Sequence, residues 1–183
     1  MAWTWKYNSI SAKPIIRQLM AFVQRDQRAA LDRVGGPNVL PAFAGYYFSE
    51  RPVKQFPALM LRSALRAFTR EVTGTRQGTL EALVGVAVQH QDPEAAAELL
   101  YDYLEALAEL FESFPLSDFS APLTLTHPMF SGGSLALTGL PATTRVTDVF
   151  VARDDSGALA RLREGFATVG VVTLTIDFEE QQA

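Results

Sequence analysis

A chain of 183 residues, 48% hydrophobic and 20% charged, has the size and composition of one globular domain. It contains no cysteine, which excludes disulfides, thiolate metal sites and a cysteine nucleophile. Its net charge of −4 argues against general nucleic-acid binding, and its apolar runs fall well short of the ~20 residues that span a bilayer. The N-terminus also lacks a signal-peptide pattern, so we expect a soluble domain that makes no membrane contact.

The first predicted element is a helix over residues 9–34. Ser11 is a suitable N-cap, and Pro14 lies in the first turn, where proline is tolerated. Apolar residues recur at helical spacing until the glycines at 35–36. Residues 35–55 contain three prolines and show no regular pattern, and they predict a loop held to the core by its aromatic side chains. These aromatic residues are Phe43, Tyr46, Tyr47 and Phe48.

Two strands joined by a turn are predicted next. The first begins at Phe56-Pro57 and continues through residues 64–72. The second covers residues 80–89, where strict alternation places one set of side chains on each face. The set expected to face the core is Leu80, Ala82, Val84, Val86 and Val88.

The clearest helix signal covers residues 93–114. Asp92 is a favourable N-cap, Pro93 fits the first helical position, and Glu94 favours the positive end of the helix dipole. Apolar residues such as Leu100, Leu104 and Phe111 recur on one side, which predicts an amphipathic helix packed against the sheet.

Residues 116–145 are rich in Ser, Thr, Gly and Pro, and we interpret them as a long irregular loop with room for two short strands. Strands are predicted at 145–153 and 166–178, separated by a turn at 154–157. We expect residues 1–8 to form a flexible arm and 179–183 a polar tail. Residues 1–183 thus form a single α+β domain, an antiparallel sheet of about four strands with helices packed on one face.

The charge is unevenly distributed. Residues 1–76 hold 12 basic and four acidic residues, a net charge of +8, and residues 77–183 hold four basic and 16 acidic residues, a net charge of −12. The two halves either mix on the folded surface or form a positive and a negative face that pair between copies. Three arginines spaced four apart are predicted to share one face, and three carboxylates begin the second helix; each set is either solvated or part of a subunit contact. These candidate interface residues are Arg62, Arg66, Arg70, Glu94, Glu98 and Asp102.

Motifs for catalysis or cofactor binding are missing. The two histidines, His90 and His127, have no third ligand at a metal-site spacing. Ser131 and Ser134 flank two glycines without a G-x-S-x-G motif, and the chain has neither a phosphate-binding loop nor a dinucleotide-binding glycine pattern. We therefore expect no enzymatic activity, cofactor or metal.

Several segments resemble tail terminator, or tail-completion, proteins of long-tailed bacteriophages. They are the Phe56-Pro57-Ala58-Leu59 strand, the valine-rich strand 83–88 leading into His90-Gln91-Asp92-Pro93-Glu94, the helix containing Tyr101–Leu107, and the late strand 146–152. The order of elements is similar over residues 15–178, and the motif is concentrated in 83–107.

The resemblance implies a virion structural protein at the head–tail junction. Such a subunit forms a hexameric ring that caps the tail tube, stops its polymerisation and joins the tail to the head connector, after assembly in the host cytoplasm. Its partners would be other copies of itself, the tail tube protein and a head–tail connector protein. The resemblance implies no cofactor and no catalytic residue.

Two alternatives stay open. The chain is either another head–tail connector ring protein, a stopper or adaptor, or a non-viral ligand-binding α+β module. The second alternative would use the Tyr46-Tyr47-Phe48 cluster and predicts a concave aromatic pocket.

Overall fold

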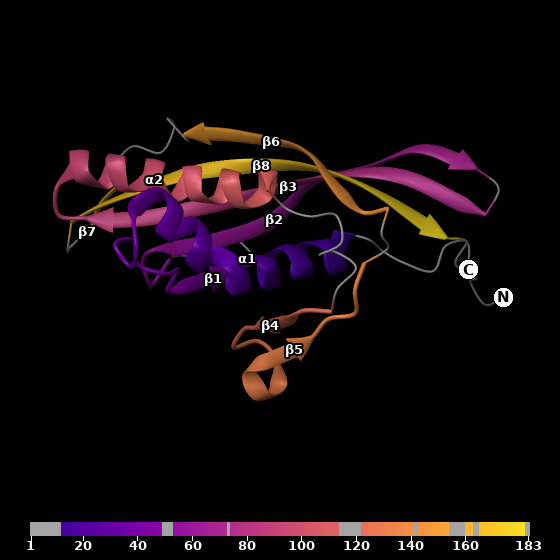
Figure 1. Ribbon diagram of the computed structural model, residues 1–183, viewed down its shortest axis with the longest axis horizontal. Helices are drawn as coiled ribbons and strands as arrows, with labels where there is room; N and C mark the ends of the chain where they lie inside the picture. The colour runs from indigo at the N-terminus through magenta and orange to yellow at the C-terminus, as the bar shows by residue number, and fades with distance from the viewer. Residues whose placement is uncertain are drawn as a thin grey trace.

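Two helices lie side by side over one face of a long, twisted β-sheet, which confirms the α+β class (Figure 1). The computed structural model describes residues 12–48, 53–72, 74–113, 122–140, 143–153, 160–162 and 165–181. Among these, no helix has the length and apolar character needed to cross a membrane. The expected arm at 1–8 and the turn at 154–157 lie outside the described residues.

The elements follow one another in the predicted alternation of helices and strand pairs. The bounds are α1 Ala12–Gly35, β1 Gly45–Tyr47, β2 Ala58–Val72, β3 Thr75–His90, α2 Pro93–Glu112, β4 Thr124–Thr126, a 3₁₀ turn Ser131–Gly133, β5 Ser134–Ala136, β6 Arg145–Arg153, β7 Ala160–Leu162 and β8 Gly165–Gln181.

The main sheet has the strand order β1-β2-β3-β8-β6, and β7 pairs with the start of β8. Its four long strands, β2, β3, β8 and β6, are antiparallel, as the sequence predicts. The three-residue strand β1 pairs in parallel with the start of β2, within the segment that was predicted to be a loop. The long strands therefore form the frame, and β1 extends it on one side.

Alternation in β3 and β8 separates a buried face from a face that neither described helix covers. Leu80 and Val84 of β3 are fully buried, as are Leu174 and Ile176 of β8, whereas Leu83 on the opposite face of β3 is only half-buried. The helices cover the first face, so the core lies between the sheet and the two helices. Burying apolar area at about 25 cal/mol per Å² is the main contribution to stability here.

Helix α2 begins where the sequence predicts. The Asp92 carboxylate accepts hydrogen bonds from the Glu94 and Ala95 amides at 2.8 and 2.9 Å, which satisfies two of the unpaired donors of the first turn. The helix then crosses β8 at Gly170, where an added Cβ would lie 2.6 Å from Leu104 Cδ1. The missing side chain thus permits close packing of helix on sheet.

The two short strands expected within residues 116–145 are confirmed as the β4–β5 hairpin, which brings Leu125 opposite Leu135. The Gln24 side chain joins this hairpin to α1, donating to the Thr126 carbonyl at 2.7 Å and accepting from the Thr126 amide at 2.9 Å. The expected polar tail is wrong for residues 179–181, because they pair with β3 as the end of β8.

Candidate subunit-interaction surfaces

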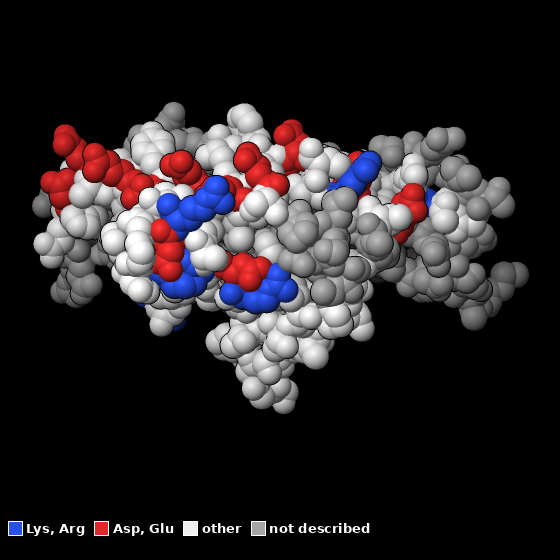
Figure 2. Space-filling view, in the orientation of Figure 1, with Lys and Arg blue, Asp and Glu red and all other residues white. Residues whose placement is uncertain are grey.

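An acidic flank lies on the solvent-facing side of α2, opposite the buried stripe of that helix. We define it by the exposed residues Glu94, Glu98, Glu105 and Glu112, which are spaced so that they share one side of the helix. Figure 2 shows acidic side chains gathered along the upper rim of the molecule, the side on which Figure 1 places β6. Asp102, the remaining acidic candidate, is half-buried on the same helix. Three predicted interface residues thus lie on one helix, and the structure adds Glu105 and Glu112.

The charge between the two helices is neutralised internally. Arg33 Nε of α1 lies 2.8 Å from Glu109 Oε1 of α2. Within α1, Arg28 pairs with Asp32, and the Asn38 amide donates to the Asp32 carboxylate at 2.7 Å. The Asn38 hydrogen bond, followed by the one from Arg28, lowers the pKa of Asp32. These charges stabilise the junction between the helices and the turn that follows α1.

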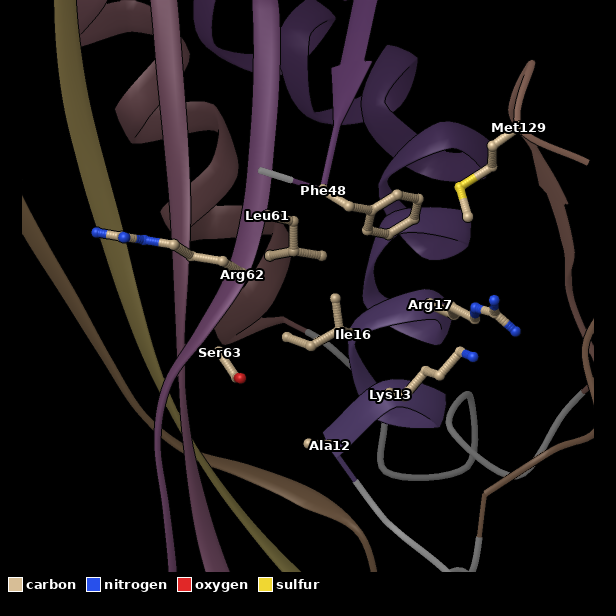
Figure 3. Close-up of a pocket in the computed structure, with 9 residues that line it drawn as sticks. All are labelled: Ala12, Lys13, Ile16, Arg17, Phe48, Leu61, Arg62, Ser63 and Met129. Carbon is tan, nitrogen blue, oxygen red and sulfur yellow. The ribbon is translucent and has the colours of Figure 1, made fainter. Parts of the chain in front are cut away.

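A groove with basic residues at its rim runs between α1 and β2, on the other side of the helix layer. It is a cavity of about 400 Å³, and Figure 3 shows Ile16, Phe48 and Leu61 pointing toward its interior. Lys13 and Arg17 lie on the same turns of α1 and point outward at the rim. The groove therefore combines an apolar floor with a cationic edge. Its lining residues are Ala12, Lys13, Ile16, Arg17, Phe48, Leu61, Arg62, Ser63 and Met129.

The register of β2 does not place the three arginine positions in the predicted row on one face. A β-bulge between Ser63 and Leu65 shifts the register, so that Arg62 lies opposite Leu83 and Arg66 opposite Leu80. Leu83 and Leu80 belong to opposite faces of β3, so these two arginine positions do as well. Arg62 is exposed at the groove, and its side chain points away from the groove interior in Figure 3. Arg70 lies beyond a second bulge, opposite Gln77.

Sequence reasoning missed the two cations that border the groove. Lys13 and Arg17 lie one helical turn apart, a spacing that places them on the same side of α1 and that the sequence shows. The Arg17 guanidinium lies 5.4 Å from the centre of the Phe130 ring, a cation–π contact that orients it. The groove itself has no local signal, because its two walls come from segments about 45 residues apart.

The aromatic cluster is divided between the core and two cavities. Tyr46 packs under α1, where burial raises its pKa and a hydrogen bond with Gln27 opposes that rise. Phe48 lines the basic-rimmed groove, whereas Tyr46 and Tyr47 both line a second cavity of about 460 Å³. The Tyr47 hydroxyl accepts a hydrogen bond from the Lys54 amide at 3.2 Å. The predicted aromatic pocket is thus confirmed for Tyr46 and Tyr47, which share one cavity, but not for Phe48, which lines the other.

His127 lines the second cavity, and both of its ring nitrogens serve structural contacts. Nε2 lies 3.1 Å from the Tyr46 carbonyl, and Nδ1 accepts from the Met129 amide at 3.1 Å, a pattern that fits the neutral Nε2–H tautomer. His90 accepts from the Asp92 amide at the start of α2. In the part of the chain that the structure describes, no group of three His, Asp or Glu side chains is arranged to hold a metal ion. Both histidines stabilise turns.

Fold and surfaces together define a two-layer α+β domain with an acidic flank at one side and a basic-rimmed groove at the other. No protein-family model matches the chain, and neither does any curated protein. Among solved structures, a chain of the virion of a native gene transfer agent (GTA) particle is similar at a TM-score of 0.37 and 11% identity, covering 96% of this chain and 100% of that one. A similarity at this level carries no functional argument, so the function has to be argued from the surfaces.

Proposed function

We propose that this protein is a structural subunit that assembles head to tail with copies of itself through flanks of opposite charge. This proposal rests on where the two flanks lie in the subunit. Helix α2, which carries the acidic flank, packs over β8 and β6, whereas α1, which carries Lys13 and Arg17, packs beside β2 at the other side of the same layer. Flanks at opposite sides of a subunit cannot pair within it, whereas they meet when one copy follows another.

A head-to-tail contact of this kind is heterologous, and it closes into a ring when the rotation between copies divides a full turn. The ring matches what the sequence resemblance implies. We propose a tail terminator of a long-tailed bacteriophage, a virion protein that forms a hexamer on the tail tube, ends tube growth and meets the head connector. In this role the chain catalyses no reaction and needs no cofactor. A stopper or adaptor ring would use the same flanks on different neighbours.

The first test is the oligomeric state of the purified protein, measured by sedimentation and by negative-stain electron microscopy. We expect closed rings at low ionic strength and smaller species at high salt, because the Debye length falls from about 10 Å at 0.1 M to about 3 Å at 1 M. A monomer at every salt and protein concentration would contradict self-assembly through these flanks.

Charge exchange provides the matched control. The triple variant Glu98→Arg/Glu105→Arg/Glu112→Arg turns the acidic flank positive, and separately Lys13→Glu/Arg17→Glu turns the basic rim negative. Each variant should lose the oligomer, because both flanks then carry the same sign. A chain with all five changes restores opposite signs and should assemble again. If the combined variant stays monomeric although it folds, charge pairing between these flanks is not what holds the copies together.

A further inference from the structure

The main sheet ends in two long edges that no described strand covers. Within the described residues, β2 beyond Met60 pairs on one side, with β3, because the pairing of β1 ends with Tyr47 opposite Met60. At the other end of the strand order, β8 is the one described strand that pairs with β6. Uncovered edges present a row of backbone donors and acceptors that pair readily with another strand.

The directions of these two edges suit each other. Each of the pairs β2–β3, β3–β8 and β8–β6 is antiparallel, so β2 and β6 run in opposite directions within one sheet. A second copy placed so that the sheet continues therefore brings its β6 beside β2 in antiparallel orientation. Antiparallel pairing is the slightly more stable of the two ladder types.

The side chains of β6 suit the groove beside β2. Phe150 and Val151 are 63% and 41% exposed, a large apolar area for an edge strand. Val149 and Val151 pair with Leu174 and Val172, so both lie on the face that carries the helices. In a continued sheet that face meets the apolar floor between α1 and β2, whereas Phe150 lies on the opposite face.

Charge favours this head-to-tail arrangement over a two-fold arrangement, in which two identical edges would pair. Pairing β6 with β6 would bring two acidic flanks together, and pairing β2 with β2 would bring together two rims that contain Lys13 and Arg17. Pairing β6 with β2 places the acidic flank of one copy beside the cations of the next. Opposite signs meet only in the head-to-tail contact.

From these observations we infer that the occupant of the β2 edge and its groove is the β6 edge of a second copy of this chain. The two strands pair antiparallel into one sheet that continues from subunit to subunit, and Val149 or Val151 enters the groove. This inference rests on the proposed head-to-tail assembly and names the contact that forms it. The helices then lie on one side of the continuous sheet in every copy.

Introduced cysteines test the contact without background, because the natural chain has none. Ser63 is exposed, and its position lies on the helix-bearing face of β2, opposite Ala82. A single-cysteine Ser63→Cys protein is mixed with Val149→Cys or Val151→Cys protein under mild oxidation. Facing residues of adjacent strands have Cβ atoms about 5 Å apart, close to the ~4 Å that a disulfide requires. Covalent heterodimer should form with at least one of the two partners.

Phe150→Cys is the matched control. Its side chain is more exposed than Val151 but lies on the other face of β6. Cross-linking by random collision would favour Phe150→Cys over Val151→Cys, whereas strand pairing favours a position on the helix-bearing face. We expect the Ser63→Cys mixture with Phe150→Cys to yield at least several-fold less heterodimer than the better of the two valine positions.

The outcomes separate this inference from the proposed function. Rings without a cross-link to either valine position would overturn edge pairing and leave the ring intact. Efficient homodimers of Ser63→Cys alone, or of Val151→Cys alone, would indicate a two-fold contact and overturn the head-to-tail arrangement. A protein that neither assembles nor cross-links would overturn both. If the pairing is correct, a Ser63→Cys/Val151→Cys double variant or its Val149 counterpart gives a covalent ladder whose largest member counts the subunits of the ring.

Discussion

Replacing Tyr103 by phenylalanine should lower stability at neutral pH and raise it, relative to the natural protein, at high pH. The ring is completely buried between α2 and the segment after α1, packed 5.2 Å from the Phe43 ring. Its hydroxyl donates a 2.6 Å hydrogen bond to the Pro41 carbonyl. Removing that hydroxyl keeps the packing and costs about 1–2 kcal/mol near pH 8, the typical cost when a hydrogen-bond partner is lost.

The pH dependence follows from the pKa. Burial raises the pKa of Tyr103 to about 12, above its ordinary value near 10. The unfolded chain therefore releases this proton before the folded chain does, so the contribution is intact below pH 10 and is lost as pH rises from 10 to 12. By proton linkage, the loss amounts to about 1.4 kcal/mol at pH 11 and about 2 kcal/mol at pH 12.

The variant lacks this proton, so the stability difference between the two proteins should shrink above pH 10 and vanish or change sign near pH 11. Urea denaturation of both proteins at pH 8 and pH 11 measures it, and the remaining tyrosines cancel because both proteins share them. An equal difference at the two pH values would refute the reasoning, since it would mean that the Tyr103 hydroxyl titrates alike in the folded and unfolded chains.

Three further substitutions test the packing that holds the surfaces in place. Gly170→Val should destabilise by about 1–3 kcal/mol, seen as a lower urea midpoint, because the new side chain meets Leu104. Gln24→Ala should speed hydrogen exchange at the Thr126 amide by roughly fivefold, the equivalent of about 1 kcal/mol, because that amide loses its acceptor. Asp92→Ala should cost about 1 kcal/mol and lower the melting temperature by about 2–4 °C, and unchanged melting would mean that the cap does not hold α2.

The elements predicted well are those whose signals are local. The alternation over residues 80–89 and the capped start of the helix at Asp92 each depend on neighbours within a few residues. Strand β1 has three residues, too few to show a period, and it exists because β2 offers an edge to Gly45–Tyr47. The β4–β5 hairpin is fixed from 102 residues away by Gln24. Such long-range pairings leave no periodic trace in the sequence.

The candidate surfaces were predictable in charge but not in geometry. The alternation of a regular strand would place Arg62 and Arg66 on one face, and one bulge at Ser63 reverses that result. Helical spacing has no such weakness, because a single α-helix keeps its angular register over many turns. This explains why the acidic side of α2 was predicted from the sequence. The pair Lys13 and Arg17 could have been predicted in the same way.

The sequence left two arrangements open for the unequal charge of the two chain halves, and the structure combines them. The halves meet between α1 and α2, where Arg33 pairs with Glu109, so part of the charge is neutralised inside one subunit. The remainder faces solvent. The exposed side of α2 is acidic, and α1 carries Lys13 and Arg17 at the rim of its groove with β2. A layer of two helices with unlike charge therefore becomes electrically polar across the sheet, and β2 and β6 are the strands at its two ends. Backbone pairing and charge pairing then favour the same head-to-tail neighbour, since the strand edges and the unlike flanks lie at the same two sides of the molecule.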